Sequence, residues 1–328
     1  MRPLVVVSGQ GLSLADGFNL VRELESTVPD CFAAVSPNDR SDLDLIVTRL
    51  YDIADARSPR ADPNTDLVEA RNQPASRLLS AIRQLAVHGP ADFEKRFPTT
   101  ADLCTRLGAI ASTRLVVLFT TNVDCAGRYG AVGHGAKWIV GDTPAGEATV
   151  EAFKQWVTEI AHLAPRFHYF PLHGEPDLVS TGDGRLFAAG LPRPGWFTSL
   201  ADGLGQGTRT LDQQSSVAHL GYRLLKGLLI GTSSGGSPDP ACAADLLVIG
   251  YGAGCNDRRD EYPFERTVDD VASNLGATSR GSWAAIARWN HSNLSDQRCQ
   301  HWFRDRGFTC LPVTRHHSCG DRISDWLA

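Results

Sequence analysis

The apolar residues of this chain fall into short runs rich in Val, Ile and Leu, and longer amphipathic segments lie between them. The short runs do not alternate with polar residues, which is typical of parallel strands buried on both faces of a sheet. Six strands are therefore predicted, at Leu4–Val7, Leu115–Phe119, Phe167–Leu172, Asp245–Gly250, Ala284–Trp289 and Phe308–Pro312.

Several segments between these strands carry apolar residues at helical spacing. Helices are predicted at Phe18–Ser26, Ser76–Val87, Ala101–Ile110 and Thr149–Leu163. Strands that alternate with helices favour an α/β fold with a doubly wound, mostly parallel, Rossmann-like sheet. A chain of 328 residues could hold two domains, but the predicted strands run from one end to the other. We therefore expect one domain over residues 1–328.

Two stretches interrupt the alternation. Residues from about 30 to 110 contain helical patterns but no convincing strand, so we expect a helical insertion after the first strand–helix unit. Residues from about 178 to 243 are rich in Gly, Pro, Ser and Thr and have no periodicity. Such a composition is typical of a long surface loop.

Glycine and polar residues follow the first predicted strand directly. In open parallel sheets, ligands bind outside the carboxyl ends of the strands. A Gly-x-Gly turn before a helix can bring backbone amides close to a phosphate, although an ordinary glycine-rich turn has the same sequence. The candidate binding residues of this turn are Ser8, Gly9, Gln10, Gly11 and Ser13.

The second predicted strand ends in Thr121-Asn122-Val123-Asp124. The amide of Asn122 could hold a ribose hydroxyl or a water, and Asp124 could orient that amide or stabilise positive charge. The alternative is an Asx-type cap that begins a helix.

Three further strand ends carry candidate residues. His173 ends the third strand before Gly174, and histidine is the side chain best suited to proton transfer near neutral pH. The alternative for His173 is a structural hydrogen bond at a strand end. The fourth strand runs into Gly250-Tyr251-Gly252 and the fifth ends at Asn290. Taken alone, each of these could be a plain strand end.

The order of these motifs resembles that of the sirtuin family. Its Gly-Ala-Gly-x-Ser loop is similar to residues 8–13, and its Thr-Gln-Asn-Ile-Asp segment is similar to residues 121–124. His173-Gly174 resembles its catalytic His-Gly, Gly250 the start of its Gly-Thr-Ser segment, and Asn290 its adenosine-side Asn. The resemblance touches both ends of the chain, in short patches.

The chain also departs from sirtuin deacylases. Those proteins carry four Cys as a zinc ribbon between the His-Gly and Gly-Thr-Ser segments, whereas residues 175–245 here contain only Cys242. One thiolate cannot build a tetrahedral four-thiolate site. Gln10 replaces the usual Ala, and Phe18–Arg22 favours a helix where deacylases carry Asp-Phe-Arg. These departures resemble the zinc-free sirtuin-like proteins of bacteria, many of which cleave NAD.

The resemblance implies an NAD glycohydrolase that breaks the bond between nicotinamide and ribose and releases ADP-ribose. The transition state would resemble an oxocarbenium ion, as in glycoside cleavage. His173 would be the general base, Asn122 would position water or ribose hydroxyls, and Asp124 would fix that geometry. The pyrophosphate would lie in a cradle of Gly9, Gly11, Ser13 and Gly250. Ser8, Gln10, Thr121, Tyr251 and Gly252 would lie beside it, and Asn290 would bind the adenosine ribose.

Two alternatives stay open: transfer of an ADP-ribosyl or acyl group to a specific acceptor, and nucleotide binding without catalysis. An effector that consumes NAD would be toxic without control. We therefore expect a homo-oligomer or a regulatory protein partner, with the insertion at 30–110 as the candidate assembly surface.

Composition narrows the remaining choices. A net charge of -5 argues against a nucleic-acid-coating role. No apolar run reaches 18 residues, so no contact with a membrane is expected. Eight Cys without a Cys-x-x-Cys pair predict free thiols in a cytoplasmic protein. No metal is expected. Near the C-terminus, the spacing of the Cys and His residues matches no zinc module; these residues are Cys299, Cys310, His316, His317 and Cys319.

Overall fold

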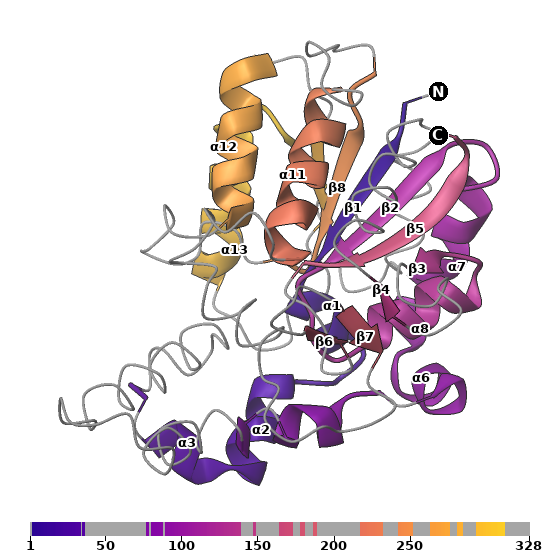
Figure 1. Ribbon diagram of the computed structural model, residues 1–328. Helices are drawn as coiled ribbons and strands as arrows, with labels where there is room; N and C mark the ends of the chain where they lie inside the picture. Colours follow the sequence, from indigo (N-terminus) through magenta and orange to yellow (C-terminus); the bar gives the residue numbers. More distant parts are fainter. Residues whose placement is uncertain are drawn as a thin grey trace, which may run out of the picture.

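A single parallel sheet forms the centre of the protein. The computed structural model describes residues 2–33, 35–36, 77–78, 80–87, 89–138, 147–148, 164–172, 178–180, 186–188, 217–231, 242–251, 263–275, 281–284 and 293–311. Within them, seven strands pair in the order β10-β9-β8-β1-β2-β5-β3 (Figure 1). The strands are β1 Leu4–Ser8, β2 Leu115–Thr120, β3 Lys137–Trp138, β5 Arg166–Pro171, β8 Asp245–Ile249, β9 Gly281–Ala284 and β10 Thr309–Leu311. Every neighbouring pair is parallel, which confirms the predicted α/β class.

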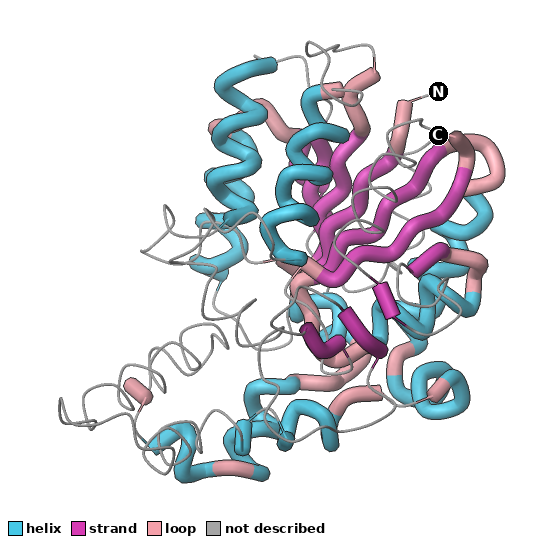
Figure 2. The backbone as a smooth tube through the Cα atoms, viewed as in Figure 1, coloured by secondary structure: helices cyan, strands magenta, loops and turns pink. Residues whose placement is uncertain are grey.

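Helices cover both faces of this sheet, because side chains along a strand point alternately to opposite faces. Val5 and Val7 of β1 lie in an apolar cluster with α11 (Val217–Ile230), α12 (Pro263–Leu275) and α13 (Asn293–Arg304). Leu4 and Val6 lie in a second cluster, with α7 (Pro98–Ile110) and α8 (Ala126–Gly133). Figure 2 shows helices on the two sides of the strands. The sheet is therefore doubly wound, and burial on both faces explains why the strand sequences are apolar without alternation.

Further helices lie beyond the end of the sheet at which β1 runs into α1 (Gln10–Ala15) (Figure 1). They are α2 (Leu20–Thr27), α3 (Pro29–Ala33) and α6 (Pro90–Arg96), together with helical residues at 77–78 and 80–85. Asn19 caps α2, because its side chain accepts a hydrogen bond from the Arg22 amide. Leu24, Phe32 and Ile82 pack into one buried cluster there. The helices predicted at 18–26 and 76–87 are thus confirmed in their central parts, whereas residues 18–19 and 86–87 are not helical.

The predicted insertion at 30–110 extends too far. Residues 98–110 form α7, whose Leu103 and Leu107 pack in the same cluster as Leu4 and Val6 of β1. This helix leads into β2 and is one of the helices that cover the sheet. Its apolar positions were visible in the sequence, but they do not show which surface they cover.

The predicted loop at 178–243 is also wrong in part. It contains β6 (Leu178–Ser180) and β7 (Leu186–Ala188), which form a small antiparallel sheet with β4 (Glu147–Ala148) in the order β4-β7-β6. It also contains α11, whose Tyr222, Leu225 and Leu229 are buried against the sheet. The Gly- and Ser-rich composition of the whole stretch masked the helical spacing of the leucines within it.

The remaining sequence predictions are settled only in part. β9 overlaps the predicted strand Ala284–Trp289 at Ala284 alone, and residues 285–289 lie outside the described part of the chain. The helix predicted at Thr149–Leu163 lies outside it as well. Among the described helices, none is both long and apolar enough to cross a membrane.

Candidate functional site

The carboxyl ends of β1, β2 and β8 meet at the middle of the sheet. Ser8 ends β1 and pairs with Thr120 of β2 on one side and with Ile249 of β8 on the other. The chain passes from β1 to the β2 side first and later returns to β8, so the strand order reverses at β1. Such a reversal leaves a crevice outside the strand ends, where doubly wound proteins bind ligands.

The Gly-x-Gly turn is joined directly to the end of β8. The Gly9 amide donates to the Ile249 carbonyl oxygen at 2.9 Å, and the Gly11 amide donates to that of Gly250 at 2.8 Å. Gly250 has a φ of +64°, and a Cβ built on it would lie 2.4 Å from the Leu12 nitrogen. A Cβ on Gly11 would lie 2.6 Å from the Gly250 Cα. Glycine adopts this left-handed conformation without strain, and only glycine leaves room for this approach of two backbones.

These contacts correct the expected role of the turn. The Gly9 and Gly11 amides, predicted to hold a pyrophosphate, donate to the backbone of β8 instead. The expected cradle is therefore not formed by these two donors in the structure. The Gly-x-Gly spacing indicates that the backbone approaches another group closely. The same spacing suits a neighbouring strand and a phosphate, so it does not tell which of the two is contacted.

Ser13 lies beside Asn122 and Asp124, the two catalytic candidates that follow β2. Gly9 is the N-cap of α1, and Ser13, one turn later, is turned inward and is 1% exposed. Its hydroxyl donates to Asp124 Oδ2 and accepts from Asn122 Nδ2 at 3.0 Å. Ser13, Asp124 and Asn122 thus form one hydrogen-bonded set, here called the polar triad. The sequence placed Ser13 with the phosphate contacts, whereas the structure places it between the two catalytic candidates.

The end of β2 holds Asn122 in position through backbone hydrogen bonds. The Asn122 amide donates to Thr120 Oγ1 at 3.0 Å, and the Thr121 amide and hydroxyl both donate to the Ser8 carbonyl oxygen. Val123, between the two polar triad residues, points into the apolar cluster of α2 and α3. This alternation turns Asn122 and Asp124 to the same side, as expected for extended chain.

Asp124 also contacts the start of the next helix, α8. Its Oδ1 accepts a hydrogen bond at 3.0 Å from the amide of Ala126, the first residue of α8. Cys125, between them, adopts a left-handed conformation with φ +63°. Asp124 thus forms an Asx turn just before α8, while the N-cap itself is Cys125 and has no side-chain cap hydrogen bond. The Asx turn coexists with membership of the polar triad.

Asp124 is 2% exposed, and this burial raises the pKa of its carboxyl group. Hydrogen bonds from Ser13 and from the Ala126 amide act in the opposite direction, as does the charge of Arg96. The charge of Asp16 adds to the rise. A buried carboxylate held by two donors is a costly arrangement that is common at functional sites.

Gln10 occupies the middle position of the Gly-x-Gly turn. Its Nε2 donates to Asn19 Oδ1 at 3.4 Å, and Asn19 is the residue that caps α2. Asp16, just past α1, accepts from the amides of Thr99 and Thr100 at the start of α7, at 2.6 and 3.2 Å. Both contacts fix α1 against its neighbours. No sequence pattern marks Asp16, because its partners are distant in the chain.

Tyr251 lies over the glycine turn, since a Cβ on Gly9 would lie 2.8 Å from the Tyr251 Cα. The Tyr251 hydroxyl donates to Glu265 Oε2 at 3.2 Å, and its ring packs edge-on against Phe264. Glu265 is 5% exposed and lies in the first turn of α12. Sequence reasoning missed Glu265, because one acidic residue in a helix carries no distinctive pattern.

His173, Gly252 and Asn290 lie outside the described residues. The residue before His173 is described: the Leu172 amide donates to the Thr120 carbonyl oxygen at 2.7 Å. The chain therefore leaves β5 next to the end of β2, where Asn122 begins the polar segment. Among the described residues, no group of three or more His, Cys, Asp or Glu side chains is placed to hold a metal ion.

Comparison of the chain with protein-family models gave no match, and comparison with curated proteins gave none either.

Proposed function

We propose that the chain is an NAD glycohydrolase of the sirtuin-like kind, which cleaves the bond between nicotinamide and ribose. One observation carries the proposal. The polar triad of Ser13, Asp124 and Asn122 is assembled at the carboxyl ends of β1 and β2, where the strand order reverses. Two of its members follow β2 in the same order as in the motif that the sequence shares with sirtuins.

The chemistry needs few groups. The carbon–nitrogen bond between ribose C1′ and nicotinamide breaks, and its electron pair neutralises the pyridinium ring as nicotinamide leaves. A water oxygen bonds to C1′ and loses one proton to a base, for which His173 is the candidate. The products are nicotinamide, ADP-ribose and a proton. Asn122 would hold the water or a ribose hydroxyl, while the buried Asp124 would favour the positive charge that develops on the ribose.

The pyrophosphate contacts need revision under this proposal. The Gly9 and Gly11 amides are bonded to β8, and the Ser13 hydroxyl is bonded within the polar triad. Among the candidates from the sequence, Gln10, Tyr251 and Gly252 remain, and Gln10 would have to exchange its hydrogen bond to Asn19 for one to a phosphate. Asn290 keeps its proposed contact with the adenosine ribose.

The test is incubation of the purified chain with NAD, followed by mass spectrometry of the products. We expect nicotinamide and ADP-ribose in equal amounts. Asn122→Ala and His173→Ala should each lower the rate on the order of 10²-fold or more. ADP-ribose attached to a protein or small acceptor would instead support group transfer. Calorimetric binding of NAD without release of nicotinamide would support a non-catalytic module.

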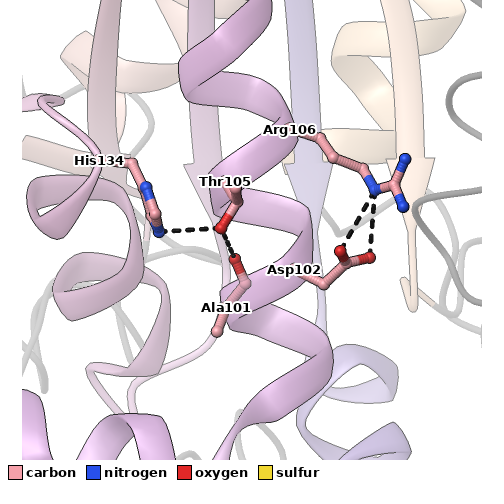
Figure 3. Close-up of polar contacts among 5 residues, drawn as sticks. All are labelled: Ala101, Asp102, Thr105, Arg106 and His134. Atoms are coloured by element: carbon pink, nitrogen blue, oxygen red, sulfur yellow. Dashed lines mark hydrogen bonds and ion pairs between the residues drawn. The ribbon is translucent and has the colours of Figure 1, made fainter.

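His134→Ala is the matched control for the histidine variant. Figure 3 shows His134 beside α7, where its Nε2 lies 3.0 Å from the Thr105 hydroxyl. His134 is exposed and belongs to the loop after α8, away from the strand ends. This variant should keep the full rate. Full activity in both Asn122→Ala and His173→Ala would contradict the proposal.

A further inference from the structure

In the polar triad, the donor and acceptor of each hydrogen bond can be assigned. The assignment starts from the backbone amide of Ala126. The Ala126 N–H can only donate, and it donates to Asp124 Oδ1. The other carboxylate oxygen, Oδ2, faces the Ser13 hydroxyl. When Asp124 is ionised, its carboxylate only accepts, so the single Ser13 proton points to Asp124.

Because that proton is committed, the Ser13 oxygen can only accept from Asn122. The donor is Asn122 Nδ2, at 3.0 Å. The side-chain amide of asparagine is planar, with its nitrogen and oxygen on opposite sides of Cγ. The carbonyl oxygen of Asn122 is therefore the end turned away from Ser13.

We propose that Ser13 is a positioning residue that makes Asn122 present its carbonyl oxygen, not its amide nitrogen, to the bound ligand. The inference rests on the proposed function for its consequence, but its geometry stands on these three side chains and one backbone amide. A carbonyl oxygen accepts a hydrogen bond from a water or a ribose hydroxyl. Its negative end also favours the positive charge that grows on the ribose when nicotinamide leaves.

An isosteric change at Asp124 would reverse the direction. In Asp124→Asn, the Ala126 N–H still requires an oxygen opposite it, so the new amide nitrogen must face Ser13. Ser13 then accepts from residue 124 and is free to donate its proton to Asn122. The Asn122 amide would turn over and present its nitrogen to the ligand, although the shapes of all side chains are almost unchanged.

The first readout needs no activity. With selective ¹⁵N labelling of asparagine, the side-chain signal of Asn122 is assigned by its loss in Asn122→Ala. In the wild-type chain, the Nδ2 proton aimed at the buried Ser13 should exchange slowly with solvent. Asp124→Asn should speed this exchange by about tenfold or more, because the nitrogen then faces the open side.

Ser13→Ala is the second variant, in case Asp124→Asn fails to fold. It removes the acceptor and adds no bulk, so the same exchange should again become fast. Asp102→Asn on α7 and Ser112→Ala in the turn after α7 are the matched controls. Asp102 pairs with Arg106 at the surface (Figure 3), and Ser112 bonds to the Ala109 carbonyl oxygen. Both controls should keep slow exchange at Asn122.

The second readout is nicotinamide release from NAD. Asp124→Asn should lower kcat on the order of 10²-fold with a smaller change in KM, since the reversed amide opposes charge that exists only in the transition state. Equal exchange at Asn122 in the wild type, Asp124→Asn and Ser13→Ala would overturn the proposal. Such equal exchange would follow if the Ser13 hydroxyl donated its proton to a carbonyl oxygen of its own helix. If the wild type releases no nicotinamide, the proposed function fails, while the exchange data still decide the role of Ser13.

Discussion

The amide of Gly11 donates to the carbonyl oxygen of Gly250 at 2.8 Å and so joins the first turn of the chain to the end of β8. The two backbones are close enough that a Cβ on either glycine would overlap the other. This contact places α1, and with it Ser13, against the end of β8.

Gly250→Ala should destabilise the protein by about 3 kcal/mol, from the left-handed backbone and from the overlap with Leu12. Gly17→Ala separates the two causes. Gly17 also has a positive φ, of +82°, but a Cβ there would meet nothing within 4 Å. Its cost should be about 1 kcal/mol. Urea unfolding of both variants measures the difference, and equal losses would show that the Gly11 contact carries no strain.

Gly221→Ala should destabilise the protein although it improves helix propensity. A Cβ on Gly221 of α11 would lie 2.4 Å from the Phe170 ring and 3.0 Å from Leu172. Phe170 is fully buried, so the overlap should cost about 1–3 kcal/mol. Gly133→Ala, in α8 with open space around it, should instead stabilise by about 0.5–1 kcal/mol. Thermal unfolding of the pair should show shifts of opposite sign.

Asp245→Ala should cost about 3 kcal/mol or more, because it leaves the buried charge of Arg114 without this carboxylate, and only the Arg2 carbonyl oxygen still accepts from the same nitrogen. Arg114 Nη1 lies 3.0 Å from Asp245 Oδ2, with the two side chains 9% and 13% exposed. Asp270→Ala removes the ion pair with Lys226. The Lys226 and Asp270 side chains are 39% and 56% exposed, so the loss should cost at most about 1 kcal/mol. Denaturant unfolding in low and high salt compares them. A similar small loss in both would contradict the expectation.

Acid should weaken the fold through His168. Burial lowers the pKa of His168 to about 4, and the charges of Arg166 and Lys137 act in the same direction. The unfolded chain, with a histidine pKa near 6.5, then binds the proton more readily than the folded one. Stability is therefore fully present above pH 6.5 and falls by about 3 kcal/mol as the pH drops to 4.

The variant His168→Leu should lose this part of the pH dependence, whereas the exposed His134→Ala should keep it. Unfolding free energies measured from pH 4 to 7 give the slopes. An unchanged slope in His168→Leu would mean that other groups cause the acid sensitivity.

The sequence predicted most of the sheet, because strands buried on both faces leave uninterrupted apolar runs such as those of β1, β2 and β8. It did not predict the extent of the segments between strands. α11 was hidden in a Gly- and Ser-rich stretch, since composition averaged over many residues conceals the local spacing of its leucines. α7 was recognised as a helix but assigned to an insertion, because helical spacing does not reveal which surface an apolar face covers.

The candidate site shows a similar division. Parallel strands end at one edge, so the proximity of the Gly-x-Gly turn to Asn122 and Asp124 followed from the pattern. The hydrogen-bond partner of each polar group did not follow from the pattern. Ser13 and Asp124 are 111 residues apart, and the choice of the Ser13 hydroxyl between phosphate and carboxylate depends on the inward turn of α1. The amides of Gly9 and Gly11 were likewise free to face a ligand or β8.

The position of β1 between β2 and β8 has a consequence for how the protein is made. β1 precedes β2 and β8 along the chain. It can pair with β2 once residues 115–120 have emerged from the ribosome, but β8 ends only at Ile249. Until then, the central strand is an open edge with unpaired backbone groups, which can pair with other chains. Closing it requires contacts between distant parts of the chain, which form slowly. The turn that holds Ser13 is therefore synthesised long before β8, the strand that supports it, has emerged.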